Sequence, residues 1–268
     1  MILATVATAL SLLAPAQPAT LIAAGDIASC RSSGDERTAA LVARIPGTVA
    51  VLGDAVYEGG TAQEFRDCYS WARFRGRTRA ALGNHEYGSG NASAAIAYFR
   101  LPRSGYYSYD LGDWHVVVLN SNCRPAGGCE RGSPQQRWLA ADLAANPARC
   151  TVAYMHHPRF SSGLHGPDTT LGALWTTLSR GGVDVVLAGH DHHYERFAPF
   201  EGIRSFVVGT GGRSHYPVLG RLSRPKSVAV NFLTYGVLRL TLRAEGYDWR
   251  FVPVAGSTYS DSGSSPCR

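Results

Sequence analysis

Lysine is nearly absent from this chain of 268 residues: Lys226 is the only one among 26 basic residues, and the others are arginines. The formal net charge is +6. An arginine bias can indicate contact with phosphate or nucleic acid, but it can also reflect a coding bias on an ordinary surface. The arginines are scattered along the sequence rather than clustered, so we favour the ordinary surface and expect no stable nucleic-acid partner.

Long apolar runs are also missing after the first residues of the chain, which excludes a later membrane-spanning helix and predicts no membrane partner. Residues 1–13 are apolar, and Ala14-Pro15-Ala16 fits the small-residue pattern of a cleavage site. This stretch lacks a basic start and is too short to span a bilayer. We therefore predict a signal peptide over residues 1–16 and a secreted, periplasmic or extracellular protein; the alternative is a buried N-terminal strand or helix.

None of the six cysteines belongs to a C-x-x-C pair, which disfavours a zinc cluster. An even number of cysteines in an exported chain favours disulfides instead. Cys123 and Cys129 flank a short turn and are the easiest pair to join. Six cysteines allow about fifteen connectivities, so the other two pairs are guesses: Cys30–Cys68 and Cys150–Cys267.

No internal repeat is visible, and the pattern is one of strands alternating with helices, in a chain long enough for one large α/β domain over residues 20–268. The predicted helices cover residues 35–45, 61–74, 91–99, 133–145 and 169–179. The predicted strands cover residues 20–24, 49–52, 79–82, 106–110, 114–119, 151–155, 183–187, 205–208, 235–242 and 247–254. The late strands favour a two-sheet layered fold. The Ser/Gly-rich residues 260–265 are predicted to be a surface tail held by Cys267.

The most informative stretch is Gly189-His190-Asp191-His192-His193-Tyr194-Glu195-Arg196, which follows the predicted strand 183–187. Imidazole is the commonest metal ligand near neutral pH, although a lone H-x-H is more simply a solvated loop. Four other predicted strands end in the same way, with metal-ligating residue types just after the strand. These loops are Gly25-Asp26, Gly53-Asp54-Ala55-Val56-Tyr57, Gly83-Asn84-His85-Glu86 and His156-His157.

Loops at the carboxyl ends of strands gather in one crevice of an open α/β sheet. Their side chains offer nitrogen and oxygen ligands without cysteine, a set that suits iron, manganese or zinc. The number of ligands exceeds what one ion needs. The sequence therefore predicts a site for two metal ions.

The ordered series of loops resembles the metallophosphoesterase (calcineurin-like) superfamily over nearly all of the chain after Thr20. The resemblance implies an α/β fold, a four-layer α/β/β/α sandwich with two mixed β-sheets. One position departs from the general pattern, because Ala28 stands where most members have a ligand histidine. Gly53-Asp54-x-x-Tyr57 instead resembles the purple acid phosphatases, whose tyrosine ligates iron(III).

Carried over residue by residue, the resemblance implies a dinuclear centre of Fe(III) and a divalent ion, which could be iron, zinc or manganese. The implied Fe(III) ligands are Asp26, Tyr57 and His192. The implied ligands of the divalent ion are Asn84, His156 and His190. Asp54 would bridge the two ions. The alternative for Tyr57 is an aromatic ring that packs after a strand.

The resemblance also makes His85 the catalytic residue that faces substrate and protonates or hydrogen-bonds the leaving oxygen. His165 and Arg159 lie in a loop where either could contact phosphate, and His165 is our second catalytic candidate. Adjacent side chains in extended backbone point oppositely, so we expect His156 rather than His157 to face the site. We expect His115 and His215 to have structural roles. Asp191 and His193 are expected to lie behind the metal ligands or on the surface.

The implied function is a secreted phosphomonoesterase of the acid phosphatase type, which acts on a small phosphorylated substrate. A metal-bridged hydroxide would attack phosphorus in line, without a covalent intermediate. One alternative is a phosphodiesterase that acts on extracellular nucleotides or nucleic acid. Another is a catalytically weak binding module. The sequence makes no prediction of the oligomeric state.

Overall fold

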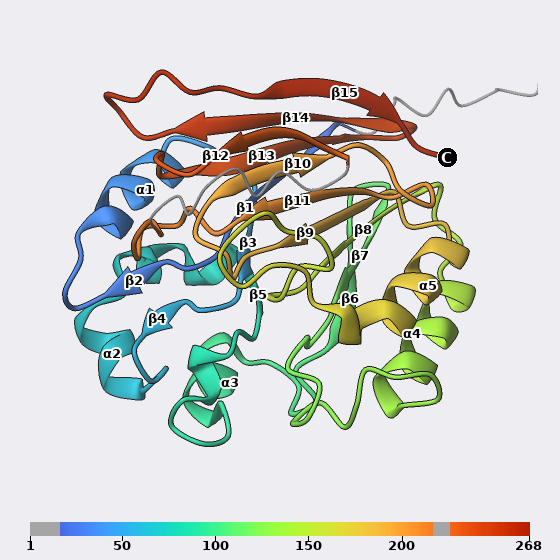
Figure 1. Cartoon of the computed structure of the whole chain (residues 1–268), viewed down its shortest axis with the longest axis horizontal. Coiled ribbons are helices and arrows are strands. Elements are labelled where there is room, and N and C mark those ends of the chain that lie inside the picture. Colours follow the sequence, from blue (N-terminus) through green and yellow to red (C-terminus); the bar gives the residue numbers. More distant parts are fainter. Residues whose placement is uncertain (1–16, 217–225) are drawn as a thin grey trace, which may run out of the picture.

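A computed structural model describes residues 17–216 and 226–268 of the chain. Two large β-sheets pack against each other, with helices α1 to α3 on one side and α4 and α5 on the opposite side (Figure 1). Each large sheet contains both parallel and antiparallel pairs. The predicted four-layer sandwich with two mixed sheets is confirmed. The predicted signal peptide lies outside the described residues.

The first sheet has six strands in the order β15-β14-β13-β1-β3-β5. Its parallel half carries the first three site loops and consists of β1 (Ala19–Ala24), β3 (Thr48–Leu52) and β5 (Thr78–Ala81). Its antiparallel half consists of β13 (Gly236–Arg243), β14 (Gly246–Pro253) and β15 (Ser262–Pro266). The carboxyl ends of the three parallel strands therefore lie at one edge.

The second sheet has seven strands in the order β12-β10-β11-β9-β8-β7-β6. Its parallel centre consists of β7 (Trp114–Val118), β8 (Cys150–Tyr154), β9 (Val185–Ala188) and β11 (Arg204–Val208). The antiparallel strands around it are β6 (Tyr107–Leu111), β10 (Tyr194–Phe197) and β12 (Ser227–Asn231). The predicted hairpin of β6 and β7 is confirmed.

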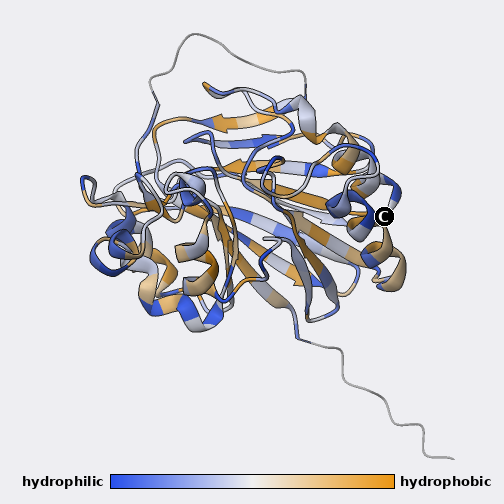
Figure 2. Cartoon of the chain, turned by 90° about the horizontal axis from the view of Figure 1, so that it is seen from below, coloured by the Kyte–Doolittle hydropathy of each residue, from blue (hydrophilic) through white to orange (hydrophobic). Residues whose placement is uncertain are grey.

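Both faces of the central strands are buried, as the continuous apolar runs require. On β7, Val116 and Val118 face the core between the sheets, whereas Val117 packs into a second cluster under α4 (Pro134–Ala145) and α5 (Gly172–Arg180). The hydrophobic colouring is accordingly concentrated on the strands (Figure 2). The remaining helical elements are α1 (Gly34–Val42), α2 (Ala62–Asp67), α3 (Ser93–Phe99) and the 3₁₀ segments Ser70–Arg77, His85–Tyr87 and Thr169–Leu171.

Two predicted elements differ from the structure. The helix expected over residues 61–74 begins as predicted, with a capping box between Thr61 and Glu64, but α2 ends at Asp67 and a 3₁₀ segment follows. Cys68 lies at the break and is tied to Cys30. The expected surface tail at 260–265 is wrong, because β15 adds to the edge of the first sheet by backbone pairing with β14, which needs no apolar side chains.

All three predicted disulfides are confirmed: Cys30–Cys68, Cys123–Cys129 and Cys150–Cys267. Such bonds are typical of oxidising compartments. Among the described residues, no helix is both long and apolar enough to cross a bilayer.

Candidate metal centre

The five loops predicted to form the site converge at the edge where the carboxyl ends of the two parallel strand sets meet. The loops after β1, β3 and β5 carry Asp26, Asp54 and Asn84, and those after β8 and β9 carry His156 and His190. Asp26, Asp54 and His190 have φ angles of 60°, 49° and 70°. Non-glycine residues with positive φ are uncommon and cluster at functional sites.

The glycines of these loops are required by close packing of the carboxylates. A Cβ atom added to Gly189 would meet Asp26 Oδ2 at 2.7 Å, and one added to Gly83 would collide with Asp54 Oδ1. Both glycines lie in the motifs that the sequence singled out. Their lack of a side chain lets the two acidic residues lie against the backbone of neighbouring loops.

A first cluster of donor atoms surrounds the hydroxyl of Tyr57. This hydroxyl lies 2.8 Å from Asp26 Oδ1, 2.8 Å from Asp54 Oδ2 and 3.2 Å from His192 Nε2. His192 Nε2 is also 3.3 Å from Asp26 Oδ1. The phenol is held there by a small ladder, in which β4 (Val56–Tyr57) pairs with β2 (Ala28–Ser29). The three residues predicted as Fe(III) ligands thus meet Asp54 at one point.

A second cluster surrounds Nε2 of His156, which is fully buried. This nitrogen lies 3.0 Å from Asn84 Oδ1, 3.2 Å from His190 Nδ1 and 3.3 Å from Asp54 Oδ2. Asp54 Oδ2 therefore belongs to both clusters. Asp54 thus lies between the two groups of donor atoms.

Hydrogen bonds at the far side of two imidazoles fix which nitrogen faces the clusters. His156 Nδ1 lies 2.9 Å from the carbonyl oxygen of Leu52, which can only accept, so the neutral imidazole carries its proton at Nδ1 and has its lone pair at Nε2. His192 Nδ1 is likewise engaged, by Ser214 Oγ at 2.9 Å. Outer hydrogen bonds of this kind are typical of metal-ligating histidines.

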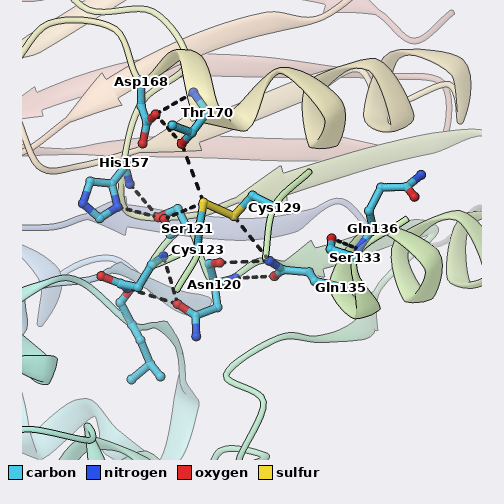
Figure 3. The surroundings of a disulfide bond; sticks show 12 residues. Asn120, Ser121, Cys123, Cys129, Ser133, Gln135, Gln136, His157, Asp168 and Thr170 are labelled. Carbon is cyan, nitrogen blue, oxygen red and sulfur yellow. Dashed lines mark hydrogen bonds between the residues drawn. A yellow bond between two sulfur atoms is a disulfide. The ribbon is translucent and has the colours of Figure 1, made fainter. Parts of the chain in front are cut away.

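The expectation that only one of His156 and His157 faces the site is wrong. The His157 ring lies 4.4 Å from the His190 ring, measured between centroids, and the three histidines offer nitrogen atoms within 4.8 Å of one another. The strand β8 ends at Tyr154, so strict alternation of side chains no longer applies to the two histidines. His157 is held by Ser121, whose Oγ is 2.8 Å from Nδ1 (Figure 3).

The two predicted catalytic histidines lie at the rim of the clusters and are partly exposed. His85 Nδ1 is 2.6 Å from the carbonyl oxygen of Glu58, and its Nε2 is 4.0 Å from Asp54 Oδ2. His165 Nδ1 is 3.0 Å from Asp191 Oδ1, and its ring lies 4.3 Å from the His190 ring. Each is oriented through Nδ1 and leaves Nε2 for other contacts.

Burial and charge shift the pKa values of the central groups strongly. Burial would raise the pKa of Asp54, but the imidazoles of His156 and His85 lower it well below its usual range. Burial lowers the pKa of His156, yet the Asp54 carboxylate outweighs this and raises it to about 10. Burial, followed by the charges of Asp26 and Asp54, raises the pKa of Tyr57 well above 10. Two buried carboxylates beside a phenol form a site suited to cations.

Several contacts at the site had not been predicted. The buried carboxylate of Glu86 accepts hydrogen bonds from the backbone N–H groups of Asp54, Ala55 and Gly83 at 2.7–2.9 Å. Burial and the Asp54 charge raise its pKa to about 7. Glu86 thus ties two site loops together. Its only sequence signal was its place beside His85.

Two residues after β11 also reach the first cluster. The Tyr216 ring stacks on His192 at 4.1 Å, and its hydroxyl lies 3.2 Å from His192 Nε2. The guanidinium carbon of Arg213 lies 5.0 Å over the Tyr57 ring, while its Nη2 is 2.5 Å from Glu58 Oε1. Neither residue belongs to a motif that the sequence identified.

The other candidate residues lie as follows. Asp191 and His193 are buried, so a surface position for them is wrong; Asp191 orients His165, and His193 bonds Glu195. His115 is buried between Asp110 and Asp142, as expected for a structural residue. Two candidates contact aromatic rings: the guanidinium of Arg159 lies over the Phe160 ring, and the His215 ring stacks on Tyr235.

A model of the calcineurin-like phosphoesterase family matches residues 3–194, more than half of the chain. The chain belongs to this family. Its relatives include an uncharacterized protein of Mycobacterium tuberculosis (strain ATCC 25618 / H37Rv), 32% identical over 202 residues that cover 63% of this chain and 37% of the relative. Purple acid phosphatase 21 of Arabidopsis thaliana is 34% identical over 140 residues, which cover 47% of this chain and 31% of that protein.

Solved structures show the same fold. Purple acid phosphatase PPD1 from yellow lupin (Lupinus luteus) seeds has a TM-score of 0.77 at 17% identity, covering 92% of this chain and 53% of that chain. GAP50, the anchor in the inner membrane complex of Plasmodium, has a TM-score of 0.76 at 15% identity. The match covers 94% of this chain and 90% of that chain. Identities this low are informative about the fold alone.

The family assignment supports the predicted dinuclear metal centre and a hydrolase of phosphoric esters, and the plant relatives support the purple acid phosphatase-like branch. The matched regions span only about a third of the curated relatives' own length.

Proposed function

We propose that this calcineurin-like phosphoesterase is a secreted acid phosphatase that hydrolyses small phosphate monoesters at a dinuclear metal centre. The observation that carries the proposal is the position of Asp54 Oδ2, within 2.8 Å of the Tyr57 hydroxyl and 3.3 Å of His156 Nε2. One carboxylate oxygen joins a phenol-containing cluster to a histidine-containing cluster. This arrangement suits two ions with different ligand preferences.

The donor atoms fit that division. The first cluster, with two carboxylates, a phenol and one imidazole, is hard and anionic, which suits Fe(III). The second cluster offers imidazoles and an amide oxygen, which suit divalent iron, zinc or manganese. His157 is a further nitrogen donor next to the second cluster. When bound, two ions would neutralise charge on the phosphate and acidify a water molecule.

His85 is suited to donate a proton to the leaving oxygen. The Glu58 carbonyl can only accept, so His85 Nδ1 holds a proton that it donates there. A second proton on the imidazole must therefore reside on Nε2, which points towards the Asp54 side of the site. A histidine protonated at this position can act as a general acid in the reaction.

His165 is suited to bind the phosphate itself. The hydrogen bond to Asp191 raises the pKa of His165 and orients its ring through Nδ1. A cationic imidazole near His190 would contact a phosphate oxygen and stabilise the developing negative charge. Ser161 Oγ, which donates to the other oxygen of Asp191, holds that carboxylate in place.

The test combines metal analysis with steady-state kinetics on an aryl phosphate monoester. The purified protein should contain about two metal ions per chain, and chelation should abolish an activity that returns on addition of iron and zinc. Asp54→Ala should lose both metals and activity, whereas Asp67→Asn, at an exposed carboxylate remote from the clusters, should retain both. An Asp54→Ala protein with two tightly bound ions and normal turnover would refute the proposal.

The same assay distinguishes a phosphomonoesterase from a phosphodiesterase. We expect kcat/KM for an aryl monoester to exceed that for the bis-aryl diester by at least tenfold. The reverse ratio would identify a phosphodiesterase at the same metal centre. A metal-loaded protein without turnover on either substrate would identify a binding module.

A further inference from the structure

A cavity lies between the edge strands of the two large sheets, and none of its lining residues belongs to the metal clusters. β5 ends the strand order of the first sheet and β6 ends that of the second. The cavity between them has a volume of about 560 Å³, and α3 contributes its C-terminal end. We call it the edge cleft. Its six principal wall residues are Arg75, Arg79, Phe99, Arg100, Tyr107 and Tyr109.

The three arginines of the edge cleft carry positive charge that the described protein does not balance. The arginine ion pairs in the described part of the chain involve Arg196, Arg213 and Arg243. Arg75, Arg79 and Arg100 form none there. Three exposed like charges around one cavity attract an anion, and the planar guanidinium group matches phosphate and carboxylate geometry.

Aromatic rings hold two of these guanidinium groups in place. The guanidinium carbon of Arg75 lies 4.7 Å over the Tyr98 ring, and that of Arg79 lies 5.7 Å over the Tyr109 ring. Stacking on a ring leaves the N–H groups at the edge of the guanidinium plane able to donate hydrogen bonds. Arg79 uses Nη1 for one such bond, to the Thr78 carbonyl oxygen at 3.1 Å, and has further N–H groups for a ligand. The guanidinium groups of Arg75 and Arg79 are therefore held beside the cavity before a ligand arrives, which lowers the entropy cost of binding.

Tyr107 and Tyr109 also provide a flat wall. They lie two residues apart on β6, so both project from the same face, with ring centroids 6.3 Å apart and an angle of 27° between the planes. Their hydroxyls are engaged inside the protein, by the carbonyl of Ala80 at 3.0 Å and by Tyr154 at 3.3 Å. The hydroxyls are therefore not free for a ligand, and what Tyr107 offers is the surface of its ring, whereas the Tyr109 ring lies under Arg79.

We propose that the edge cleft is a non-catalytic binding site for an anion that carries an aromatic ring, of the nucleoside monophosphate class. The arginines would bind the phosphate, and the ring of Tyr107 would stack on the base, because Arg79 already lies over the Tyr109 ring. A volume of about 560 Å³ lies in the range of small-molecule sites. From the sequence we expected the arginines to be scattered over the surface, whereas these three line one cavity.

The test uses the AMP isostere in which a methylene group replaces the 5′ oxygen, because this phosphonate has no ester to hydrolyse. Calorimetric titration into the Asp54→Ala protein isolates the cleft from the metal centre. Arg75→Gln, Arg79→Gln and Arg100→Gln together should weaken binding at least tenfold. The control changes three exposed arginines elsewhere to glutamine, Arg44, Arg239 and Arg250, and should weaken it less than twofold.

Methylphosphonate, which lacks the ring, should bind at least tenfold more weakly than the isostere. In the metal-loaded protein with Asp54 intact, the cleft triple variant should hydrolyse an aryl phosphate with unchanged kcat/KM. Equal weakening by the two triple variants, equal binding of the two phosphonates, or no binding to the Asp54→Ala protein would each overturn the proposal. If Asp54→Ala does not fold, the same titrations are run on chelator-treated protein with Asp54 intact.

Discussion

The hydroxyl oxygen of Tyr57 lies 2.8 Å from a carboxylate oxygen of Asp54, only three residues earlier in the chain. Asp54 has a left-handed backbone conformation, with φ of 49°, and the chain then enters the two-residue strand β4, which ends at Tyr57. The turn points the carboxylate and the phenol at the same place. The second contact of the phenol, to Asp26, comes from a different loop.

Replacing Tyr57 with phenylalanine tests whether the phenol is a metal ligand. A phenolate bound to Fe(III) gives a visible charge-transfer band, so the iron-loaded protein should be coloured and Tyr57→Phe should be bleached. The fold should persist, because one oxygen is lost from a ring that otherwise packs as before. Absorption spectra and circular dichroism of the two iron-loaded proteins measure both effects.

Tyr69→Phe is the matched control for this substitution. Tyr69 is buried, and its hydroxyl has no hydrogen-bond partner among the described residues. The control protein should keep the visible band of the parent. A colourless parent protein, or a Tyr57→Phe protein that keeps its colour, would show that Tyr57 only packs and that the centre uses two divalent ions.

Replacing His85 with alanine separates a proton donor from a metal ligand. His85→Ala should keep both metals but lose on the order of a hundredfold or more in kcat, as expected for a general acid. The loss should shrink for substrates with good leaving groups, which need less protonation. Metal content and kcat across a series of aryl phosphates provide the measurement; loss of the metals would make His85 a ligand.

The positions of the candidate ligands could be predicted because they follow strands directly. A parallel strand fixes where its carboxyl end lies, so Asp26, Asp54 and Asn84 needed only their strands to be recognised. The same reasoning failed for His157. It assumed extended backbone beyond Tyr154, where β8 has already ended.

Contacts between distant loops could not be predicted in this way. Ser121 reaches His157 across 36 residues, and Glu86 reaches the backbone of Asp54 across 32. Such pairs depend on how loops pack, which no local pattern records. The strand β15 was also missed, because serine and glycine favour turns and its pairing with β14 uses only backbone groups.

Asp35 should make the stability of the protein depend on pH. Burial raises the pKa of this carboxyl to about 6, with Ser70 as its hydrogen-bond partner. Because the folded pKa exceeds the unfolded one, its stabilising contribution is complete below about pH 4 and is lost as the pH rises through 6. Asp35→Asn should match the parent near pH 4 and be more stable above pH 7, by about 1 kcal/mol after allowance for solvent screening.

Denaturant unfolding of chelator-treated protein between pH 4 and pH 8 measures this difference. Asp67→Asn is the control, because Asp67 is exposed at the end of α2. Its difference from the parent should stay within about 0.5 kcal/mol across the range. If the free energy of unfolding of Asp35→Asn varied with pH as that of the parent does, ionisation of Asp35 would not destabilise the fold.

The disulfides Cys123–Cys129 and Cys150–Cys267 should differ in what their removal changes. The first closes a loop of 6 residues next to Ser121, which holds His157 (Figure 3), whereas the second closes a loop of 117 residues at the start of β8. The entropy of loop closure predicts a loss of about 2 kcal/mol for the first pair and about 5 kcal/mol for the second.

Changing each pair to serine therefore separates stability from function. Cys123→Ser with Cys129→Ser should lower the melting temperature modestly but raise KM for an aryl phosphate severalfold, because the Ser121 support of His157 is loosened. Cys150→Ser with Cys267→Ser should lower the melting temperature more and leave KM unchanged while the protein stays folded, since Cys150 lies at the opposite end of β8 from His156. Kinetics at 15 °C and thermal melts measure both. An unchanged KM in the first variant would show that the disulfide beside Ser121 contributes to stability alone.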